Sequence, residues 1–188
     1  SITNPKICQE NKNLSNNINV NYTKNLIDEC INNNKKIIFF SSDYVFDGNK
    51  GNYSENDKPN PINLYGEQKL KIENYLKSQT KNYTILRISK TFFLDLKTDC
   101  FLKNIIKELK KPGNSINCIK KQVFTPICVE DIADVLNKVI KLNIKTLHVG
   151  GQDTFDRKDI IKLVAKKLNN KKEISILKNE IVENDSKF

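Results

Sequence analysis

The sequence predicts an α/β fold in which helices and strands alternate around a parallel sheet. Two apolar runs, IIFF at 37–40 and YTILRIS at 83–89, lack the alternation of a half-exposed strand. Such runs are typical of strands that are covered on both faces. Each run is preceded by a predicted helix, and helices and strands that alternate in this way imply right-handed crossovers and a parallel sheet. The pattern therefore indicates a Rossmann-like, doubly wound parallel sheet.

The first half of the chain holds the main sheet elements. Apolar residues recur at helical spacing from Ile18 to Ile31, and three consecutive asparagines end this pattern. A loop rich in Gly, Asn, Asp and Pro at 43–61 is longer than most connections, which is more usual for functional loops than for packing connectors. The expected helices are 17–33 and 62–79, and the expected strands are 36–41 and 83–89.

The second half predicts a smaller α/β lobe laid over the carboxyl edge of the sheet, where ligands bind in such folds. The expected helices are 100–110, 130–142 and 157–168, and the expected strands are 116–119, 146–149 and 174–177. We therefore divide the chain into an incomplete Rossmann-like core at 1–90 and a substrate-binding lobe with late core elements at 91–188.

Composition narrows the class of protein. No apolar run approaches the ~20 residues of a membrane span, and the Asn-rich N-terminus does not resemble a signal peptide. The five cysteines are widely scattered and form no C-x-x-C pair, which favours reduced thiols over disulfides or a zinc site. We therefore expect a cytoplasmic protein with no membrane partner and no metal.

The net charge of +10 allows two interpretations. A nucleic-acid binder usually gathers its lysines into one stripe with interleaved aromatic residues. Here the lysines are spread over every predicted helix, so we expect no nucleic-acid partner. A basic protein also suits an anionic small substrate such as a nucleotide diphosphate.

Three side chains around the long loop form a candidate proton-transfer site. Tyr65 and Lys69 are four residues apart and share one helix face, and Ser42 ends the preceding strand. A phenol titrates near ~10, and a nearby ammonium is expected to lower that pKa toward a value useful in acid–base catalysis. Ser42 could donate a hydrogen bond to an oxygen on which charge develops. The set suits ketone reduction or alcohol oxidation, with hydride from a cofactor. The alternative is a surface tyrosine beside a solvated lysine.

The residues around this site resemble one known family. The block SSDYVFDG at 41–48, the Pro-Asn-Pro at 59–61 and the Y-G-x-x-K at 65–69 closely resemble the dTDP-4-dehydrorhamnose reductases, which are extended short-chain dehydrogenase/reductases. Further similar segments are NVNYTKNL at 19–26, LRIS at 86–89, Q-x-x-T-P with D-I-A at 122–133, and HVGG followed by an arginine at 148–157.

The resemblance implies a role for each matching residue at the reacting centre. Tyr65 would be the general acid that protonates the C4 oxygen of a nucleotide-linked 4-keto sugar. Lys69 would lower the pKa of the tyrosine and hydrogen-bond the nicotinamide ribose, and Ser42 would lie beside the carbonyl. Asn19 would help to hold the lysine and a relay water, with a plain helix-start residue as its alternative. Ser41 joins Asn19, Tyr65 and Lys69 among the implied cofactor-binding residues.

The resemblance also implies contacts with the substrate. These would come from Asp43, Val45, Gln122 and Thr125, and for the last two an ordinary turn or strand role is an equal alternative. We expect Arg87 to anchor a strand end and the single histidine, His148, to be a packed strand residue. Which sugar nucleotide is bound stays open.

The implied function is reduction of a nucleotide-linked 4-keto sugar by NADPH or NADH, a step of dTDP-rhamnose biosynthesis. A nucleotide-sugar epimerase or dehydratase is a second interpretation. A third is a non-catalytic regulatory subunit, because the β subunit of methionine adenosyltransferase is similar to the same family. The resemblance allows a homodimer.

The sequence also departs from the family. Its six glycines form neither G-x-x-G-x-x-G nor G-x-G-x-x-G, the turn on which the cofactor pyrophosphate normally sits at a helix N-terminus. We therefore expect a fragment of the full enzyme that does not bind NADPH usefully by itself. Tyr22 replaces a family glycine, and residues 90–93 (KTFF) replace an aromatic residue followed by a V-Y-G turn, so the substrate loop departs from the family pattern.

Overall fold

A computed structural model of the chain describes residues 1–95, 100–119 and 122–177. The described residues form two compact units. The first consists of residues 1–88 together with 138–149, and the second of residues 89–137 and 150–177 as far as they are described.

The first unit is built on a three-stranded parallel sheet in the order β1-β2-β7. These strands are β1 (Ile37–Ser42), β2 (Tyr83–Ile88) and β7 (Thr146–Val149). In the register of the sheet, Ser42 pairs with Ile88, which in turn pairs with Val149. All three strands therefore end at the same edge, and the α/β class with a parallel sheet is confirmed.

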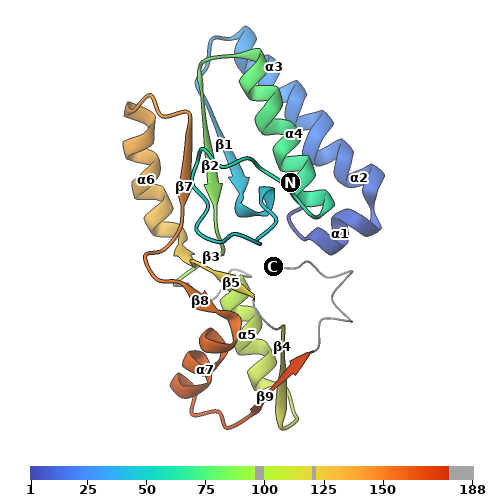
Figure 1. Cartoon of the computed structure of the whole chain (residues 1–188), viewed down its shortest axis with the longest axis vertical. Helices are drawn as coiled ribbons and strands as arrows, with labels where there is room; N and C mark the ends of the chain where they lie inside the picture. The colour runs from blue at the N-terminus through green and yellow to red at the C-terminus, as the bar shows by residue number, and fades with distance from the viewer. Residues whose placement is uncertain (96–99, 120–121, 178–188) are drawn as a thin grey trace. The chain divides into compact units, whose positions relative to one another are not determined.

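Two helices, α3 (Thr23–Asn32) and α4 (Leu64–Gln79), lie side by side along one side of β1 and β2 (Figure 1). Their apolar residues pack with those of the sheet into one core, which includes Val20, Ile27, Ile72, Leu76 and Ile85. The side chain of Asn63 caps α4 by accepting a hydrogen bond from the Gly66 N–H at 2.9 Å, a cap that satisfies one free donor of the first turn.

The N-terminal segment is helical, whereas the hydrophobic periodicity of the sequence predicts a first helix that begins only at residue 17. It forms α1 (Pro5–Glu10), α2 (Lys12–Asn16) and a π-helix, η1 (Asn17–Tyr22), which continues into α3. The Asn4 side chain accepts from the N–H groups of Lys6 and Ile7, and Pro5 opens the helix. Asn followed by Pro is an N-cap signal that hydrophobic periodicity alone overlooks.

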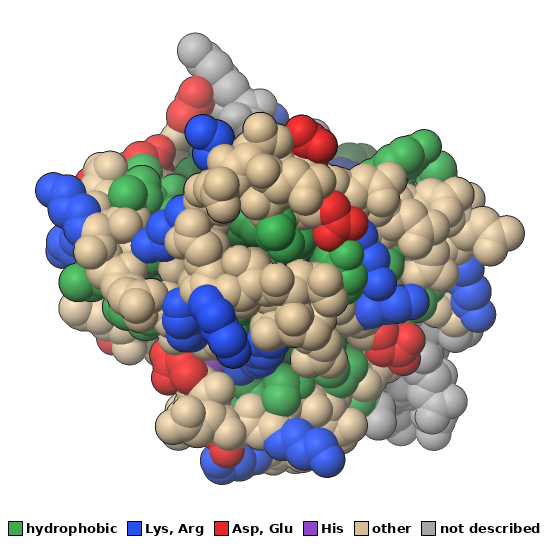
Figure 2. Space-filling model, turned by 90° about the horizontal axis from the view of Figure 1, so that it is seen from above, with side chains coloured by type: hydrophobic (Ala, Val, Ile, Leu, Met, Phe, Trp, Pro, Cys, Tyr) green, Lys and Arg blue, Asp and Glu red, His purple; other side chains and the backbone are tan. Residues whose placement is uncertain are grey.

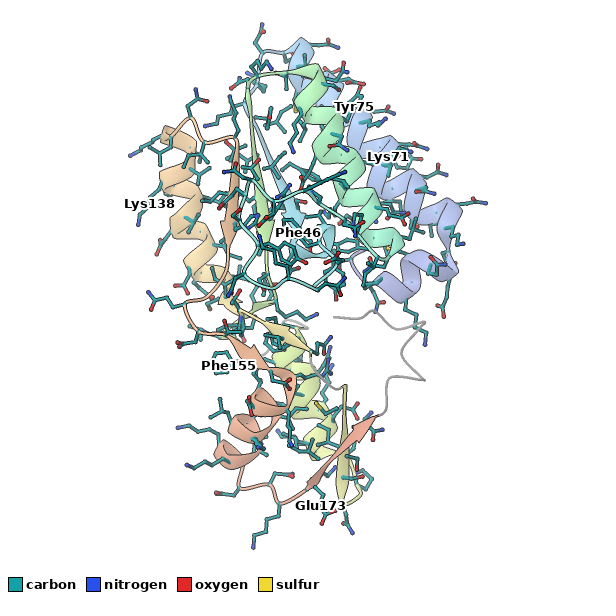
Figure 3. All side chains as sticks on the ribbon, viewed as in Figure 1. Phe46, Lys71, Tyr75, Lys138, Phe155 and Glu173 are labelled. Carbon is teal, nitrogen blue, oxygen red and sulfur yellow. The ribbon has the colours of Figure 1, made fainter. Side chains whose placement is uncertain are left out.

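The long loop after β1 is tied down by its own side chains. It begins with a 3-10 turn, η2 (Asp43–Val45). Phe46, labelled in Figure 3, is buried and stacks on Tyr53 with ring centroids 4.3 Å apart. The Asp47 carboxylate accepts hydrogen bonds from the Tyr53 hydroxyl and from the Asn60 amide. These contacts give the loop a defined shape next to the end of β1.

The second unit contains α5 (Phe101–Lys110), α7 (Arg157–Lys167) and a parallel pair formed by β4 (Ser115–Ile119) and β9 (Glu173–Leu177). Its core includes Ile105, Leu109 and Ile161. The helix α6 (Val129–Lys141) begins in this unit and enters the first unit at Lys138. The predicted helices and strands from residue 100 onward agree with these elements to within one residue at each end.

Two pairs of two-residue strands in the second unit are too short for sequence periodicity to reveal. They are the parallel pair of β3 (Thr91–Phe92) with β6 (Ile127–Cys128), and the antiparallel pair of β5 (Val123–Phe124) with β8 (Phe155–Asp156). Gly150 and Gly151 pack against the link between β5 and β6. A Cβ at Gly151 would lie 2.1 Å from the carbonyl oxygen of Pro126, so only glycine fits there.

On the face that Figure 2 displays, the Lys and Arg side chains lie in separate groups among polar and acidic ones. Within the described residues, no helix has the length and apolar character needed to cross a membrane.

Candidate active site

Ser42, Tyr65 and Lys69 come together in the first unit at the carboxyl end of β1. Ser42 is the last residue of that strand, and the other two lie on the first turns of α4. The Ser42 side chain lies close enough to Tyr65 to lower the pKa of the phenol. The Lys69 Nζ atom lies 5.6 Å from the centroid of the Tyr65 ring. The hydroxyl, phenol and ammonium predicted from the sequence are therefore neighbours.

A glycine makes this close approach possible. A Cβ at Gly66 would lie 2.1 Å from the carbonyl oxygen of Tyr44, so α4 can pack directly on the η2 turn only because that atom is missing. The approach sets the Tyr65 ring edge-on to the Tyr44 ring, with centroids 5.6 Å apart. Ser42 is held in turn by its neighbours, since its Oγ donates to Asp43 Oδ1 at 3.0 Å and accepts from the Tyr44 N–H at 3.3 Å.

The pKa of Tyr65 is raised from its ordinary value, whereas a nearby lysine alone would lead us to expect a lowered pKa. Burial of the phenol is the main cause, because a phenolate in a dry site loses its hydration. The negative charge of Asp43 raises the pKa further, and the hydrogen bond with Ser42 opposes the shift. The phenol is thus held in its protonated form at neutral pH, which is the form a proton donor must have.

Lys69 is the basic group of the site. Its Nζ donates to the carbonyl oxygen of Phe40 at 2.8 Å and lies 4.9 Å from the centroid of the Phe39 ring. Burial lowers the pKa of Lys69 to about 8, because the charged ammonium is poorly hydrated there. Near neutral pH this side chain can therefore either carry or release a proton.

Lys69→Met should reveal this shifted pKa as a pH-dependent stability difference. Below pH 8, the poorly hydrated ammonium lowers the stability of the folded wild-type protein. Between pH 8 and the ordinary lysine pKa the unfolded chain binds more protons, so the stability of the wild type rises with pH. The free energy of unfolding of the variant minus that of the wild type should therefore fall by about 1–2 kcal/mol from pH 7 to pH 10. Urea denaturation at each pH measures it.

Lys71→Met is the matched control, because Lys71 is exposed on the same helix (Figure 3). Its stability difference from the wild type should stay flat over this pH range. A flat difference for Lys69→Met as well would contradict the lowered pKa of Lys69.

A buried ion pair lies one turn further along α4. Glu73 is fully buried and receives two hydrogen bonds from Arg87, at 3.0 Å from Nε and at 2.7 Å from Nη2. The Ser41 hydroxyl donates to the same carboxylate at 2.6 Å. Arg87 thus anchors the end of β2 as expected. Glu73 was not among the residues predicted from the sequence, although its place four residues after Lys69 puts it on the buried helix face.

His148 joins the loop to the sheet. Its Nδ1 lies 3.1 Å from the carbonyl oxygen of Tyr53, and Arg87 Nη1 lies 3.3 Å from its Nε2. Its backbone N–H donates to Glu55 Oε1 at 2.8 Å, and its ring packs edge-on to Phe46. His148 is therefore the packed strand residue that the sequence indicated.

The remaining predicted cofactor residues of this unit face other partners. The Ser41 hydroxyl points to Glu73. Asn19 is buried, and its amide bonds to Ile2 and Gln68 rather than to Lys69 in the hydrogen bonds that the structure gives it. Their roles toward a cofactor stay predictions.

The predicted substrate residues are divided between the two units. In the first, Asp43 is half-buried beside Ser42, and Val45 is fully buried with its carbonyl oxygen accepting from the Asn60 N–H. In the second, Gln122 is buried, and its Oε1 accepts from Arg157 Nη1 at 3.0 Å. Thr125 packs against Gly150, where a Cβ would lie 2.4 Å from its Oγ1. A substrate role for all four stays a prediction.

The residues of this chain fit only part of a nicotinamide dinucleotide. Tyr65 and Lys69 offer a hydroxyl and an ammonium of the kind that hold a ribose. None of the six glycines opens a helix after a strand, as a pyrophosphate turn requires. Gly48, Gly51 and Gly113 occupy positive-φ positions outside helices and strands, and the other three pack against neighbouring backbone or side chains.

The comparison with known families agrees with this geometry. Residues 2–184 match the family model described as the RmlD substrate binding domain. The chain belongs to the RmlD substrate binding domain family. The matched region includes the Ser42, Tyr65 and Lys69 cluster and extends over both compact units.

Two curated relatives carry different names. The methionine adenosyltransferase 2 subunit beta of Bos taurus is 27% identical over 172 residues, which cover 88% of this chain and 52% of that protein. The dTDP-4-dehydrorhamnose reductase of Aggregatibacter actinomycetemcomitans is 33% identical over 123 residues, or 65% of this chain and 41% of that protein. The RmlD-family chain thus spans about half the length of the curated relatives it matches.

Solved structures confirm the fold. The dTDP-4-dehydrorhamnose reductase of Bacillus anthracis, in complex with NADP, has a TM-score of 0.87 at 25% identity, covering 97% of this chain and 66% of that one. The corresponding reductase of Clostridium acetobutylicum has a TM-score of 0.85 at 27% identity, covering 96% and 63%. The Thermus thermophilus UDP-glucose 4-epimerase, a complex with NAD, shares the fold at 16% identity and a TM-score of 0.79, covering 93% of this chain and 62% of that one.

Proposed function

We propose that this chain carries the acid–base residues of an NAD(P)H-dependent reductase that acts on a nucleotide-linked 4-keto sugar, as dTDP-4-dehydrorhamnose reductases do. The observation that supports it most directly is the cluster at the end of β1, where Ser42 ends the strand, Tyr65 lies on the first turn of α4, and the Lys69 Nζ atom lies 5.6 Å from the centroid of the Tyr65 ring. The family membership and the reductases among the relatives support the same activity.

In this proposal the cofactor, when bound, supplies the hydride. Tyr65 starts protonated, because its raised pKa keeps the proton on the phenol, and gives that proton to the C4 oxygen of the sugar. Ser42 donates a hydrogen bond to the same oxygen as negative charge builds on it. Lys69 lies close enough to Tyr65 to stabilise the phenolate left after the transfer.

The proposal also covers the cofactor, the class of substrate, the location in the cell and the assembly of the protein. The cofactor is NADPH or NADH, the substrate is a nucleotide sugar, and we place the protein in the cytoplasm. The chain is the part of a reductase that comes after the glycine-rich half, and a homodimer is its proposed assembly. The curated relatives, each about twice as long as the matched region, support its being part of a longer protein.

A cofactor-binding experiment tests whether this chain needs a glycine-rich half in order to bind NADPH. The 188 residues expressed alone should show no binding of NADPH at micromolar concentrations, monitored by the fluorescence of the reduced nicotinamide, because they hold no pyrophosphate turn. The protein expressed from its complete reading frame is the comparison. Micromolar binding by the 188 residues alone would contradict the prediction.

A turnover experiment tests the function itself. Protein from the complete reading frame, mixed with NADPH and dTDP-4-dehydrorhamnose, should lose nicotinamide absorbance in a one-to-one ratio with the sugar reduced. An epimerase or dehydratase returns its hydride within each cycle, so unchanged absorbance together with conversion of a nucleotide sugar would support that interpretation instead.

A second candidate function is that of a regulatory subunit. It is favoured by one specific observation, which is that several of the matching relatives are methionine adenosyltransferase 2 beta subunits from vertebrates, at 26–36% identity. In that case the protein should co-purify with the catalytic subunit of a methionine adenosyltransferase and should turn over no keto sugar. Turnover without such a partner would exclude it.

A further inference from the structure

His148 links the long loop after β1 to the parallel sheet, and both nitrogens of its ring have a partner. Nδ1 lies 3.1 Å from the carbonyl oxygen of Tyr53, and Nε2 lies 3.3 Å from Nη1 of Arg87. A carbonyl oxygen can only accept a hydrogen bond, and a guanidinium can only donate one. Both contacts are therefore hydrogen bonds only when Nδ1 carries the proton and Nε2 keeps its lone pair. The surroundings select this one neutral tautomer.

The partner on the sheet side is held in place. Arg87 is buried, and its Nε and Nη2 atoms donate to the Glu73 carboxylate at 3.0 and 2.7 Å. Its Cζ atom also lies 5.0 Å from the centroid of the Phe46 ring. These contacts fix the guanidinium from the other side, so that Nη1 stays next to the ring of His148.

The loop is fastened to the same residue by further contacts. The backbone N–H of His148 donates to Glu55 Oε1 at 2.8 Å, and the His148 ring packs edge-on to Phe46 with centroids 5.5 Å apart. Phe46 in turn stacks on Tyr53, whose hydroxyl donates to Asp47. Both the backbone and the rings of the loop are thus joined to β7 through one side chain.

This loop connects two residues of the candidate active site. Ser42 ends β1 before the loop, and Tyr65 is the second residue of α4 after it. The base of the loop is closed by the Asn60 N–H, which donates to the carbonyl oxygen of Val45 at 2.9 Å. Contacts that hold the loop therefore help to hold the segment between the hydroxyl and the phenol.

We propose that His148 is a positioning residue for the segment that joins Ser42 to Tyr65, and that a second proton on its ring releases this segment. The latch consists of the two ring bonds, to Tyr53 and to Arg87. A second proton goes to Nε2, where it faces the Arg87 guanidinium, so that the bond is lost and two positive charges lie 3.3 Å apart. The catalytic meaning of the latch rests on the proposed reductase function, whereas the latch itself concerns only the folded chain.

The charged groups around the ring decide how the latch responds to pH. Arg87, from β2, opposes a second proton on the ring, and Glu73, from α4, is paired with that arginine. Tyr53 faces the ring through its carbonyl oxygen, which does not titrate. The hydrogen bond from the His148 backbone N–H is the main cause of the lowered pKa of Glu55, which therefore stays ionised from about pH 5 upward. Over the range from about pH 5 to 8 in which histidines ordinarily titrate, the imidazole is the group of this set that changes charge.

The first measurement is ¹⁵N NMR of the imidazole, which needs no assignment because His148 is the only histidine of the chain. The two nitrogens of a neutral imidazole resonate far apart, and their couplings to the ring C–H hydrogens show which one is protonated. At pH 8 we expect the proton on Nδ1. The opposite tautomer would overturn the proposal. The same spectra show when the ring takes up its second proton.

Trypsin then reports whether the loop is closed. Lys50 is the one cleavable site in residues 43–61, because Lys58 precedes Pro59. Cleavage after Lys50 is scaled at each pH to that of a free peptide with the sequence 43–61, which corrects for the activity of the protease. We expect the scaled rate to rise about tenfold as the ring becomes charged, the effect of losing one to two hydrogen bonds that hold the loop.

Three variants assign this response to the ring. His148→Phe keeps the edge-on packing and removes both nitrogens, so its loop should be cleaved about tenfold faster than that of the wild type at pH 8, with no further rise on acidification. His148→Asn offers an amide donor near the Tyr53 carbonyl oxygen that cannot take up a proton, so its cleavage should be slower than in His148→Phe and independent of pH. Glu55→Gln keeps an acceptor without the charge and should retain the pH response of the wild type.

Two results with the wild type would overturn the proposal without any variant. One is a scaled cleavage rate that stays at its pH 8 value although the ring has become charged, and the other is a ring that stays neutral down to pH 5. A purely structural histidine would lower the melting temperature when it is replaced, but it would give the wild-type loop no dependence on pH. If His148→Phe does not fold, His148→Asn and the wild-type measurements decide.

These readouts separate the inference from the proposed function, because they need no turnover. A loop that opens as the ring becomes charged, in a protein that reduces no keto sugar, would support the latch and contradict the reductase. A loop that stays closed in a protein that does reduce one would do the opposite.

Discussion

Arg87→Met should lower the free energy of unfolding by about 3–5 kcal/mol, the cost expected when one member of a buried ion pair is removed. Arg87 is 3% exposed and Glu73 has no exposed surface, so the carboxylate left behind could not regain its hydration. The 2.7 Å contact between Nη2 and Oε2 and the second bond from Nε are both lost. Domains of this size are stable by only about 5–15 kcal/mol, so the variant should be close to unfolding. Urea denaturation monitored by circular dichroism measures the change.

The double variant Glu73→Gln with Arg87→Met is the informative control. It removes the buried charge together with its partner, and the glutamine can still accept from the Ser41 hydroxyl and donate elsewhere. It should therefore recover a large part of the lost stability, which double-mutant logic identifies as coupling between the two side chains. Equal losses in the single and the double variant would show that the arginine acts through packing against Phe46 instead.

Tyr65→Phe should reduce turnover of the keto sugar by roughly 10²–10⁴-fold, the usual contribution of a positioned general acid. Phenylalanine keeps the edge-on contact with Tyr44 and removes only the phenolic hydroxyl. The loss of this one hydroxyl should change stability by only about 1 kcal/mol. The rate of NADPH oxidation by protein from the complete reading frame gives the effect on catalysis, and urea denaturation gives the effect on the fold.

Tyr75→Phe is the matched control for this change. Tyr75 lies on the same helix (Figure 3), and its hydroxyl donates to Asp28 Oδ1 at 2.5 Å, so the substitution likewise removes one phenolic hydroxyl from α4. Turnover should stay at the wild-type level, because this hydroxyl lies away from the Ser42 cluster. Nearly full activity in Tyr65→Phe would exclude Tyr65 as the acid, whatever reaction the protein catalyses.

The amino-acid sequence was enough to predict the fold class and to nominate the residues of the proposed acid–base set. Unbroken apolar runs identified the covered strands β1 and β2, because burial on both faces leaves no room for polar alternation. Helical spacing placed Tyr65 and Lys69 on one face of α4. These features are local, since each depends on residues only a few positions apart, and local patterns can be interpreted without coordinates.

Only the tertiary structure decided the environment of those side chains. The net pKa of Tyr65 depends on its burial and on the nearby Asp43 charge, and the four-residue spacing of Tyr65 and Lys69 specifies neither. Glu73 meets Arg87, and Gln68 meets Asn19, across 14 and 49 residues of sequence. A pKa and a buried hydrogen bond depend on the nearest atoms in space, and the order of residues along the chain does not specify which atoms those are.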